Sequence, residues 1–313
     1  YTFLILDKDK RFLKTTFSTY ISPKLIDQMV DGKTVPKLGG DEDIHTAVFT
    51  DIQEFSRFSE QLTPTELVEL LNDYLTEMTN ILLDNQGTLD KYIGDAIVAF
   101  YGAPVPVEDH EYKACLTALL MQKKLYELRK KWKTESKYWP NIVYNMQMRI
   151  GIHTGKMVTG NMGSKHRMNY TMMGDTVNLA ARLESSAKQY GIYSQISEET
   201  YLSIQDRISV RELDHVRVFG KENPVKTYEL ISLRGQEPEW YKQINEPFAK
   251  GIHHFQKGEF EKAKQLFELT VENENMFDGR NINPSLLYVE RCNMLIKKPP
   301  KEWDGIWSLT SKK

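Results

Sequence analysis

The sequence predicts an α+β fold in which helices cover a mostly antiparallel sheet. Two short apolar segments, 88–93 and 96–101, have the length of strands and follow each other directly, as in a hairpin. Two longer segments, 64–82 and 110–131, repeat apolar residues at the spacing of one helix face. Strands and helices in this order indicate two layers, with helices packed over one sheet.

The predicted hairpin turns at Gly94 and Asp95. Glycine before an acidic residue suits a two-residue hairpin turn, because glycine adopts a positive φ without steric cost. We therefore expect Asp95 at an exposed tip, with Lys91 four residues earlier on the same hairpin. Taken alone, the pattern is more typical of an ordinary surface turn than of a functional site.

A second acidic residue, Asp51, ends the strand predicted over 46–51 and precedes a helix. The free N–H groups of the turn and of the helix N-terminus, together with the helix dipole, suit a phosphate group. If Asp51 and Asp95 converge to ~4 Å, their charges repel by about 1–4 kcal/mol, depending on access of water. A divalent cation that prefers carboxylate oxygen, such as Mg²⁺ or Mn²⁺, would relieve this repulsion.

Capping residues and periodicity predict the other elements. Residues 63–66 form a capping box with proline at the first helical position, so they start the helix over 64–82. Farther along the chain we expect a strand pair, 146–153 and 156–160, around Thr154 and Gly155. A polar arm over 160–170 and a helix from Asp175 should follow. Three further strands are expected at 192–196, 208–219 and 225–231.

The N-terminal segment, residues 1–40, is predicted to be a linker helix and loop. It includes Gly39-Gly40-Asp41-Glu42, which we interpret as a solvated loop before the first strand. Apolar residues at 2–6 precede four basic residues between 8 and 14. This pattern fits the cytoplasmic end of a membrane helix, and it equally fits a short buried segment with a basic face.

The C-terminal segment, 234–313, is predicted to be a small helical appendage. Its aromatic and aliphatic residues are spaced as two short helices joined at Gly258, similar to one tetratricopeptide-type hairpin. One such repeat cannot bury its own apolar face. We therefore expect it to dock on the central domain or to extend through 286–295 into a third helix, with Trp303 and Trp307 covering the apolar face. A peptide-binding role is the alternative.

Composition excludes several classes of protein. The chain has 313 residues, of which 40% are hydrophobic, so it can bury a large core. Its formal net charge of −2 gives no broad basic surface for nucleic acid. Cys115 and Cys292 are too few for a disulfide framework and fit a reducing compartment.

Three motifs resemble the catalytic domain of class III adenylyl/guanylyl cyclases. They are the sequences FTDIQEFS from Phe49, LDKYIGDAIVAFYG from Leu89 and YTMMGDTVNLAARLE from Tyr170, and the resemblance covers residues 40–233. It implies a ferredoxin-like core, a catalytic domain over 41–233, and cyclisation of a nucleoside triphosphate with release of pyrophosphate. Related cyclases often carry membrane or sensor regions before the catalytic domain. The resemblance therefore implies that this chain is the cytoplasmic domain of a membrane-anchored protein.

The resemblance implies roles for the acidic pair and its surroundings. Asp51 and Asp95 match the family's metal-binding carboxylates, and the Ile52 carbonyl is a further expected ligand. Two divalent cations, Mg²⁺ or Mn²⁺, would then neutralise the attacking and leaving oxygens. The backbone from Ile52 through Phe55 and Ser56 would hold the β- and γ-phosphates.

Other matching positions concern the ribose and the triphosphate. Asn178 and Arg182 lie four residues apart, hence on one helix face. They match the family's pair that orients the ribose and braces the α-phosphate. Lys221 aligns with a lysine that contacts the triphosphate. The structural alternative is an asparagine that caps nearby backbone and an arginine paired with Glu184.

Two positions bear on the choice of base. Lys91 can donate to adenine N1, and the Thr171 hydroxyl can accept from the N6 amino group, which matches an adenine-selecting subclass of the family. The resemblance implies a head-to-tail homodimer, in which one protomer gives Asp51 and Asp95 and the other gives Lys91, Thr171, Asn178, Arg182 and Lys221. We therefore expect ATP as substrate; a guanylyl or mixed-specificity cyclase, or a catalytically silent regulatory partner, is the alternative.

Overall fold

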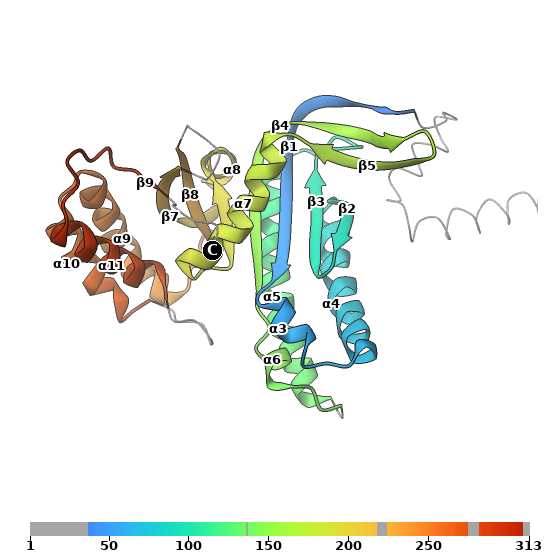
Figure 1. Ribbon diagram of the computed structural model, residues 1–313, viewed down its shortest axis with the longest axis horizontal. Helices are drawn as coiled ribbons and strands as arrows, with labels where there is room; N and C mark the ends of the chain where they lie inside the picture. Colours follow the sequence, from blue (N-terminus) through green and yellow to red (C-terminus); the bar gives the residue numbers. More distant parts are fainter. Residues whose placement is uncertain (1–36, 136, 218–223, 275–281, 309–313) are drawn as a thin grey trace, which may run out of the picture.

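A computed structural model describes residues 37–308 except 136, 218–223 and 275–281 (Figure 1). The linker and the apolar and basic residues predicted over 1–36 lie outside the described residues, as does Lys221. None of the helices in the described part combines the length and the apolar character that crossing a membrane requires.

The described strands form one sheet in the order β2-β3-β1-β4-β6-β8-β7-β9, with β5 paired to β4. Only the β4–β6 and β7–β9 pairs are parallel, so the sheet is mostly antiparallel, as predicted. The strands are β1 Gly39–Ile52, β2 Thr88–Ile93, β3 Ala96–Tyr101, β4 Met148–Ser164, β5 Arg167–Met173, β6 Ser194–Ser197, β7 Ile208–Arg217, β8 Val225–Leu233 and β9 Trp307–Ser308.

Helices cover the two faces of this sheet unequally (Figure 1). The helices are α3 Phe55–Ser59, α4 Pro64–Asp84, α5 His110–Thr134, α6 Asn141–Tyr144, α7 Asp175–Tyr190, α8 Glu198–Ile204, α9 Glu239–Gln256, α10 Phe260–Val271 and α11 Pro284–Lys297. On one face, α4 and α5 pack against alternate residues of the central strands, such as Val48 and Ile97, in the main apolar core. On the other face, Ala180 of α7 packs with Ala47 and Phe100 in a smaller cluster.

Helix α4 begins as the sequence predicts. The Thr63 hydroxyl accepts from the Glu66 N–H at 3.3 Å, and the Glu66 carboxylate accepts from the Thr63 N–H at 2.9 Å. Pro64 occupies the first helical position, where its missing N–H costs no hydrogen bond. The predicted apolar stripe is buried along this helix, with Leu70, Tyr74, Met78 and Leu82 facing the core.

The strand pair predicted around Thr154 and Gly155 is wrong, because β4 runs without a turn through both residues. Thr154 pairs with Thr46 inside the long β1–β4 ladder. The β1–β4 ladder also includes residues 39–42, which form a strand and not the predicted loop. Gly40 and Gly160 face each other there, and a Cβ at Gly160 would lie 2.3 Å from the Gly40 Cα, so the close approach of these strands needs glycine.

The polar arm predicted over 160–170 is a β-hairpin formed by the end of β4 and by β5. Figure 1 shows this hairpin extending away from the sheet on the side opposite the C-terminal helices. Its strand β5 carries Thr171 and leads through Gly174 into α7. The hairpin therefore fixes the position of Thr171 relative to the start of α7.

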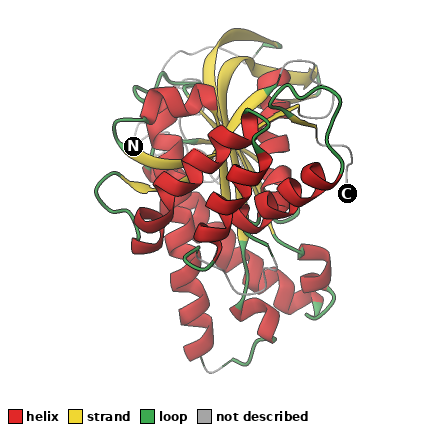
Figure 2. Ribbon diagram, turned by 90° about the vertical axis from the view of Figure 1, so that its left-hand side faces the viewer, coloured by secondary structure: helices red, strands yellow, loops and turns green. Residues whose placement is uncertain are grey.

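The segment after 234 contains α9, α10 and α11, so the predicted helical pair does extend into a third helix. Figure 2, seen from the side of these helices, shows them in front of the sheet. They share their own aromatic cluster, in which the Trp303 ring lies 5.3 Å from the Phe255 ring, and Trp307 packs on the same cluster. The predicted covering role of the two tryptophans is confirmed.

Buried polar contacts join these helices to β7 and to α7. Arg291 of α11 donates to Asp214 of β7 at 2.5 Å, and the same carboxylate accepts from the Tyr190 hydroxyl at 2.8 Å. Tyr190 is the last residue of α7. The C-terminal helices are thus anchored to the end of the helix that carries Asn178 and Arg182.

Candidate active site

The carboxyl groups of Asp51 and Asp95 come together at the end of β1, close enough for each to shift the pKa of the other. Asp95 lies in the two-residue turn between β2 and β3, where Gly94 has φ 64° as predicted. Its expected exposure is wrong, since Asp95 is 6% exposed. The turn folds against the end of β1, and the Ile52 N–H donates to Asp95 Oδ2 at 2.8 Å.

The electrostatics of this pair favour binding of a cation. Burial raises the pKa of Asp95 to about 6, the Ile52 N–H lowers it in part, and the neighbouring Asp51 charge raises it again. Burial also raises the pKa of Asp51, against the effect of the Arg149 guanidinium, which lowers it. Asp95 is buried and Asp51 is half-buried, and the raised pKa values favour a proton on the pair that a divalent cation can replace.

The donor set fits Mg²⁺ or Mn²⁺. Two carboxylates and the Ile52 carbonyl are hard oxygen ligands, and Mg²⁺ commonly takes one or two carboxylates together with water and substrate phosphate. Within the described residues there is no group of three or more His, Cys, Asp or Glu side chains that could hold a metal. Water and substrate oxygens would complete the coordination of a cation at Asp51 and Asp95.

Cation affinity should depend on pH because a metal must displace the proton from Asp95. With the pKa of Asp95 at about 6, the carboxylate is mostly protonated at pH 5 and mostly ionised at pH 7. We expect the Mn²⁺ dissociation constant to be about tenfold larger at pH 5 than at pH 7 for one proton released. Free Mn²⁺ measured by electron paramagnetic resonance tests this, and an affinity unchanged across that range would contradict it. Asp95→Asn is the control, since it should bind weakly at both pH values.

Arg149 belongs to this site and was missed from the sequence. It faces Asp51 across the β1–β4 ladder, and its Nη2 lies 2.5 Å from Asp51 Oδ2. Its Nε donates to Glu184 of α7 at 2.8 Å. Burial raises the pKa of Glu184 to about 6, although Arg149 lowers it. The signal in the sequence was an arginine inside the apolar strand that begins at Met148.

The close approach of α7 makes the Arg149–Glu184 pair possible. A Cβ at Gly151 would lie 2.2 Å from the Glu184 backbone nitrogen, so a larger residue in β4 would push the helix away. Gly151 therefore sets the distance between α7 and the strand that carries Arg149.

Two N–H groups of the backbone segment that was expected to hold phosphate form hydrogen bonds within the protein. The Gln53 N–H donates to the Gln147 carbonyl at 2.8 Å, and the Ile52 N–H donates to Asp95. These two amides are not available to a triphosphate. Glu54 has φ 57°, a left-handed conformation that is unfavourable for a non-glycine residue, and it leads into the short helix α3 with Phe55 and Ser56.

Asn178 and Arg182 lie on the side of α7 turned away from its buried residues. Asn178 is exposed and Arg182 is half-buried, while Leu179 and Leu183 face the core. Among the described residues, neither polar side chain has a hydrogen-bond or ion-pair partner. The structural alternative for Arg182 is wrong, because Glu184 pairs with Arg149. No contact joins Asn178 or Arg182 to the acidic pair within this chain.

Lys91 and Thr171 do come together. Lys91 Nζ lies 3.3 Å from Thr171 Oγ1, although 80 residues separate them in the sequence. A third residue, Asp90, contacts both: Thr171 Oγ1 donates to Asp90 Oδ2 at 2.5 Å, and Lys91 Nζ lies 3.3 Å from Asp90 Oδ1. Asp90 was also missed, because an acidic residue beside a lysine in an edge strand gives no distinctive signal.

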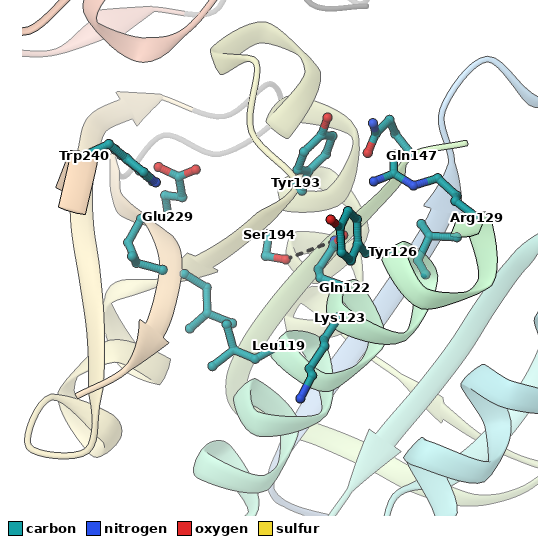
Figure 3. Close-up of a pocket in the computed structure, with 13 residues that line it drawn as sticks. Leu119, Gln122, Lys123, Tyr126, Arg129, Gln147, Tyr193, Ser194, Glu229 and Trp240 are labelled. Atoms are coloured by element: carbon teal, nitrogen blue, oxygen red, sulfur yellow. Dashed lines mark hydrogen bonds between the residues drawn. The ribbon is translucent and has the colours of Figure 1, made fainter. Parts of the chain in front are cut away.

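A separate hollow of about 440 Å³ lies between α5 and the strands β6 and β8. Figure 3 shows Tyr126 and Leu119 of α5 on one side of it and Glu229 and Trp240 on the other. Its lining is mostly apolar, and none of the predicted site residues contributes to it. The candidate active site is therefore not this hollow but the region of Asp51 and Asp95.

The fold and the acidic pair define a nucleotide cyclase domain. A family model described as the adenylate and guanylate cyclase catalytic domain matches residues 41–232. The chain belongs to this family.

Known relatives include both adenylyl and guanylyl cyclases. Adenylate cyclase 1 of Rhizobium meliloti is 30% identical over 218 residues, which is 70% of this chain and 32% of that protein. The crystal structure of the adenylyl cyclase CyaB from P. aeruginosa aligns with a TM-score of 0.57 at 34% identity, over 64% of this chain and 100% of that one. The guanylyl cyclase Cya2 aligns with a TM-score of 0.56 at 32% identity, over 64% of this chain and 97% of that one. This chain spans less than half the length of the curated relatives it matches.

Proposed function

We propose that this chain is an adenylyl cyclase that converts ATP to 3′,5′-cyclic AMP and pyrophosphate with two Mg²⁺ or Mn²⁺ ions. The observation that carries the proposal is the convergence of Asp51 and Asp95 at the end of β1, where the N–H of Ile52, the residue after Asp51, donates to Asp95 at 2.8 Å. Two carboxylates this close repel each other, and Arg149 contacts only Asp51, so a divalent cation would stabilise the pair further. The named adenylate cyclase relatives support the same reaction class.

We propose the following roles for the residues that would bind the cations and the phosphates. Asp51 and Asp95, with the Ile52 carbonyl, hold the cations, which supply charge neutralisation at the attacking 3′-oxygen and at the leaving pyrophosphate. If a cation took the place of Arg149 at Asp51, the Nη groups of Arg149 would be available to a phosphate oxygen, while its Nε would still donate to Glu184. The backbone at Phe55 and Ser56 is the proposed contact for the outer phosphates.

Asn178 and Arg182 are proposed to act on the nucleotide held by the other protomer of a head-to-tail homodimer. Asn178 would orient the ribose, and Arg182 would stabilise charge that develops on the α-phosphate. Their lack of partners among the described residues supports this assignment, and so does the position of α7 on the sheet face that carries Asp51. Lys221 is proposed as a further triphosphate contact.

The base site is proposed to select adenine. The ammonium of Lys91 is a donor for N1, and Thr171 is an acceptor for the N6 amino group. Guanine presents a donor at N1 and an acceptor at O6, which is the reverse pattern. The contact between Lys91 and Thr171 supports one shared recognition surface.

Competition between ATP and GTP in one assay with Mn²⁺ tests this selectivity. We expect kcat/KM for ATP to exceed that for GTP by at least tenfold, which is about 1.4 kcal/mol of discrimination. A preference for GTP, or none, would favour a guanylyl or mixed-specificity cyclase. Absence of either cyclic product from a folded dimer would favour a regulatory role.

The division of the chain is also proposed. Residues 41–233 would form the catalytic domain, and 234–313 would form a helical segment that braces it through Asp214 and Arg291. A membrane or sensor region upstream, with this domain on the cytoplasmic side, is the setting that we propose for the full protein.

A further inference from the structure

We propose that Asp90 fixes the direction of the Thr171 hydroxyl and thereby makes the base site select adenine. This inference rests on the proposed function and concerns a residue that has no role in it so far. It explains how a hydroxyl, which can donate as well as accept, discriminates between purines.

A bulge in β2 brings Asp90 to the base site. The ladder pairs Leu89 with Ala99 and then Lys91 with Val98, so Asp90 is the extra residue between them. Adjacent residues of a regular strand point to opposite faces of the sheet. Here both Asp90 and Lys91 reach Thr171, because a bulge redirects the side chains of its strand.

The contacts of the Thr171 hydroxyl allow it to act toward a ligand only as a hydrogen-bond acceptor. A threonine hydroxyl has one hydrogen to donate and two lone pairs that accept. The hydrogen goes to Asp90 Oδ2 at 2.5 Å, and one lone pair faces Lys91 Nζ at 3.3 Å. The remaining lone pair is an acceptor, which suits the adenine amino group and repels the guanine O6.

The surroundings of Asp90 hold this arrangement in place. Its side chain is 2% exposed, so water does not compete for the carboxylate. Burial raises the pKa of Asp90, while Thr171, Lys91 and the Met172 backbone lower it by hydrogen bonding or charge. The side chain of Lys91, in contrast, is 44% exposed and can turn toward a base.

The variant Asp90→Asn reverses the direction of this hydrogen bond. Lys91 can only donate, so the amide oxygen of the variant should face Lys91 and its NH₂ group should face Thr171. The Thr171 hydrogen is then free to point at the base. The size of the side chain is almost unchanged, which separates the effect from loss of packing.

The test uses three triphosphates that keep N1 as an acceptor and differ only at position 6 of the purine. ATP has a donor there, purine riboside triphosphate has hydrogen, and 6-methoxypurine riboside triphosphate has an acceptor. We expect the wild-type kcat/KM to fall in that order. In Asp90→Asn, the ratio of kcat/KM for ATP to that for the 6-methoxy analogue should drop at least tenfold.

Asp73→Asn is the matched control. Asp73 also accepts from a lysine and from a neutral donor, Lys131 Nζ at 2.9 Å and Trp132 Nε1 at 2.8 Å, but it lies on α4 away from the base site. Its specificity ratio should equal that of the wild type. An unchanged ratio in folded Asp90→Asn would overturn the inference and leave the proposed function standing.

The wild-type protein alone also tests the inference, in case Asp90→Asn does not fold. If the wild type uses the 6-methoxy analogue as well as the unsubstituted purine, the Thr171 hydroxyl rotates freely and the inference is wrong. If the wild type forms no cyclic product from ATP, the proposed function itself fails, and the inference fails with it.

Discussion

Mixing Asp51→Ala chains with Arg182→Ala chains should restore cyclase activity that neither variant has alone. Each variant by itself loses one residue from both of its equivalent sites, and we expect a loss of at least ~10²-fold in kcat. A heterodimer of the two has one intact site and one doubly broken site. Since random pairing makes about half of the dimers mixed, the recovered activity should approach about a quarter of the wild-type value.

The control for this experiment mixes two variants that damage the same half of the site. Asp51→Ala with Asp95→Ala removes acidic ligands that one protomer supplies, so every site in every pairing stays incomplete. No recovery is expected from this mixture. Absence of recovery in the Asp51→Ala and Arg182→Ala mixture as well, despite heterodimers seen by native mass spectrometry, would refute the shared site.

Replacing Arg211 by methionine should destabilise the whole protein by about 3–5 kcal/mol, because it leaves two buried carboxylates without a counter-charge. Arg211 of β7 is 2% exposed and donates to Glu229 of β8 and to Glu274, which follows α10. Glu274 also accepts from the Ser285 N–H at the start of α11. Arg211 therefore helps to hold the sheet and the C-terminal helices together, and denaturant unfolding measures its effect.

Arg207→Met is the control for that measurement. Arg207 pairs with Asp109 at 2.8 Å, but the two side chains are 40% and 54% exposed. An exposed pair of this kind contributes little to stability, because water and salt screen the charges. If Arg211→Met is no more destabilising than Arg207→Met, or if the C-terminal helices unfold in a separate earlier transition, the bracing role is wrong.

Local patterns predicted those parts of the fold that depend on nearby residues. The capping box at Thr63 and Glu66, the turn at Gly94 and the apolar stripe of α4 all have the expected form. Each is decided within a few residues by hydrogen bonding, by permitted φ values or by helical spacing. The prediction for β4 failed because a Thr-Gly pair is also compatible with a strand, and the long ladder with β1 decides between the two.

The sequence by itself determined the class of this protein, its α+β fold and the residues expected to hold metal, base and ribose. Only the tertiary structure decided that Asp95 is buried against β1, that Arg149 stands beside Asp51, and that Asp90 holds Thr171. The physical reason is the distance along the chain: these contacts join residues 43, 98 and 81 positions apart. Burial and the direction of a hydrogen bond depend on such partners, and they are set when the strands and α7 pack together.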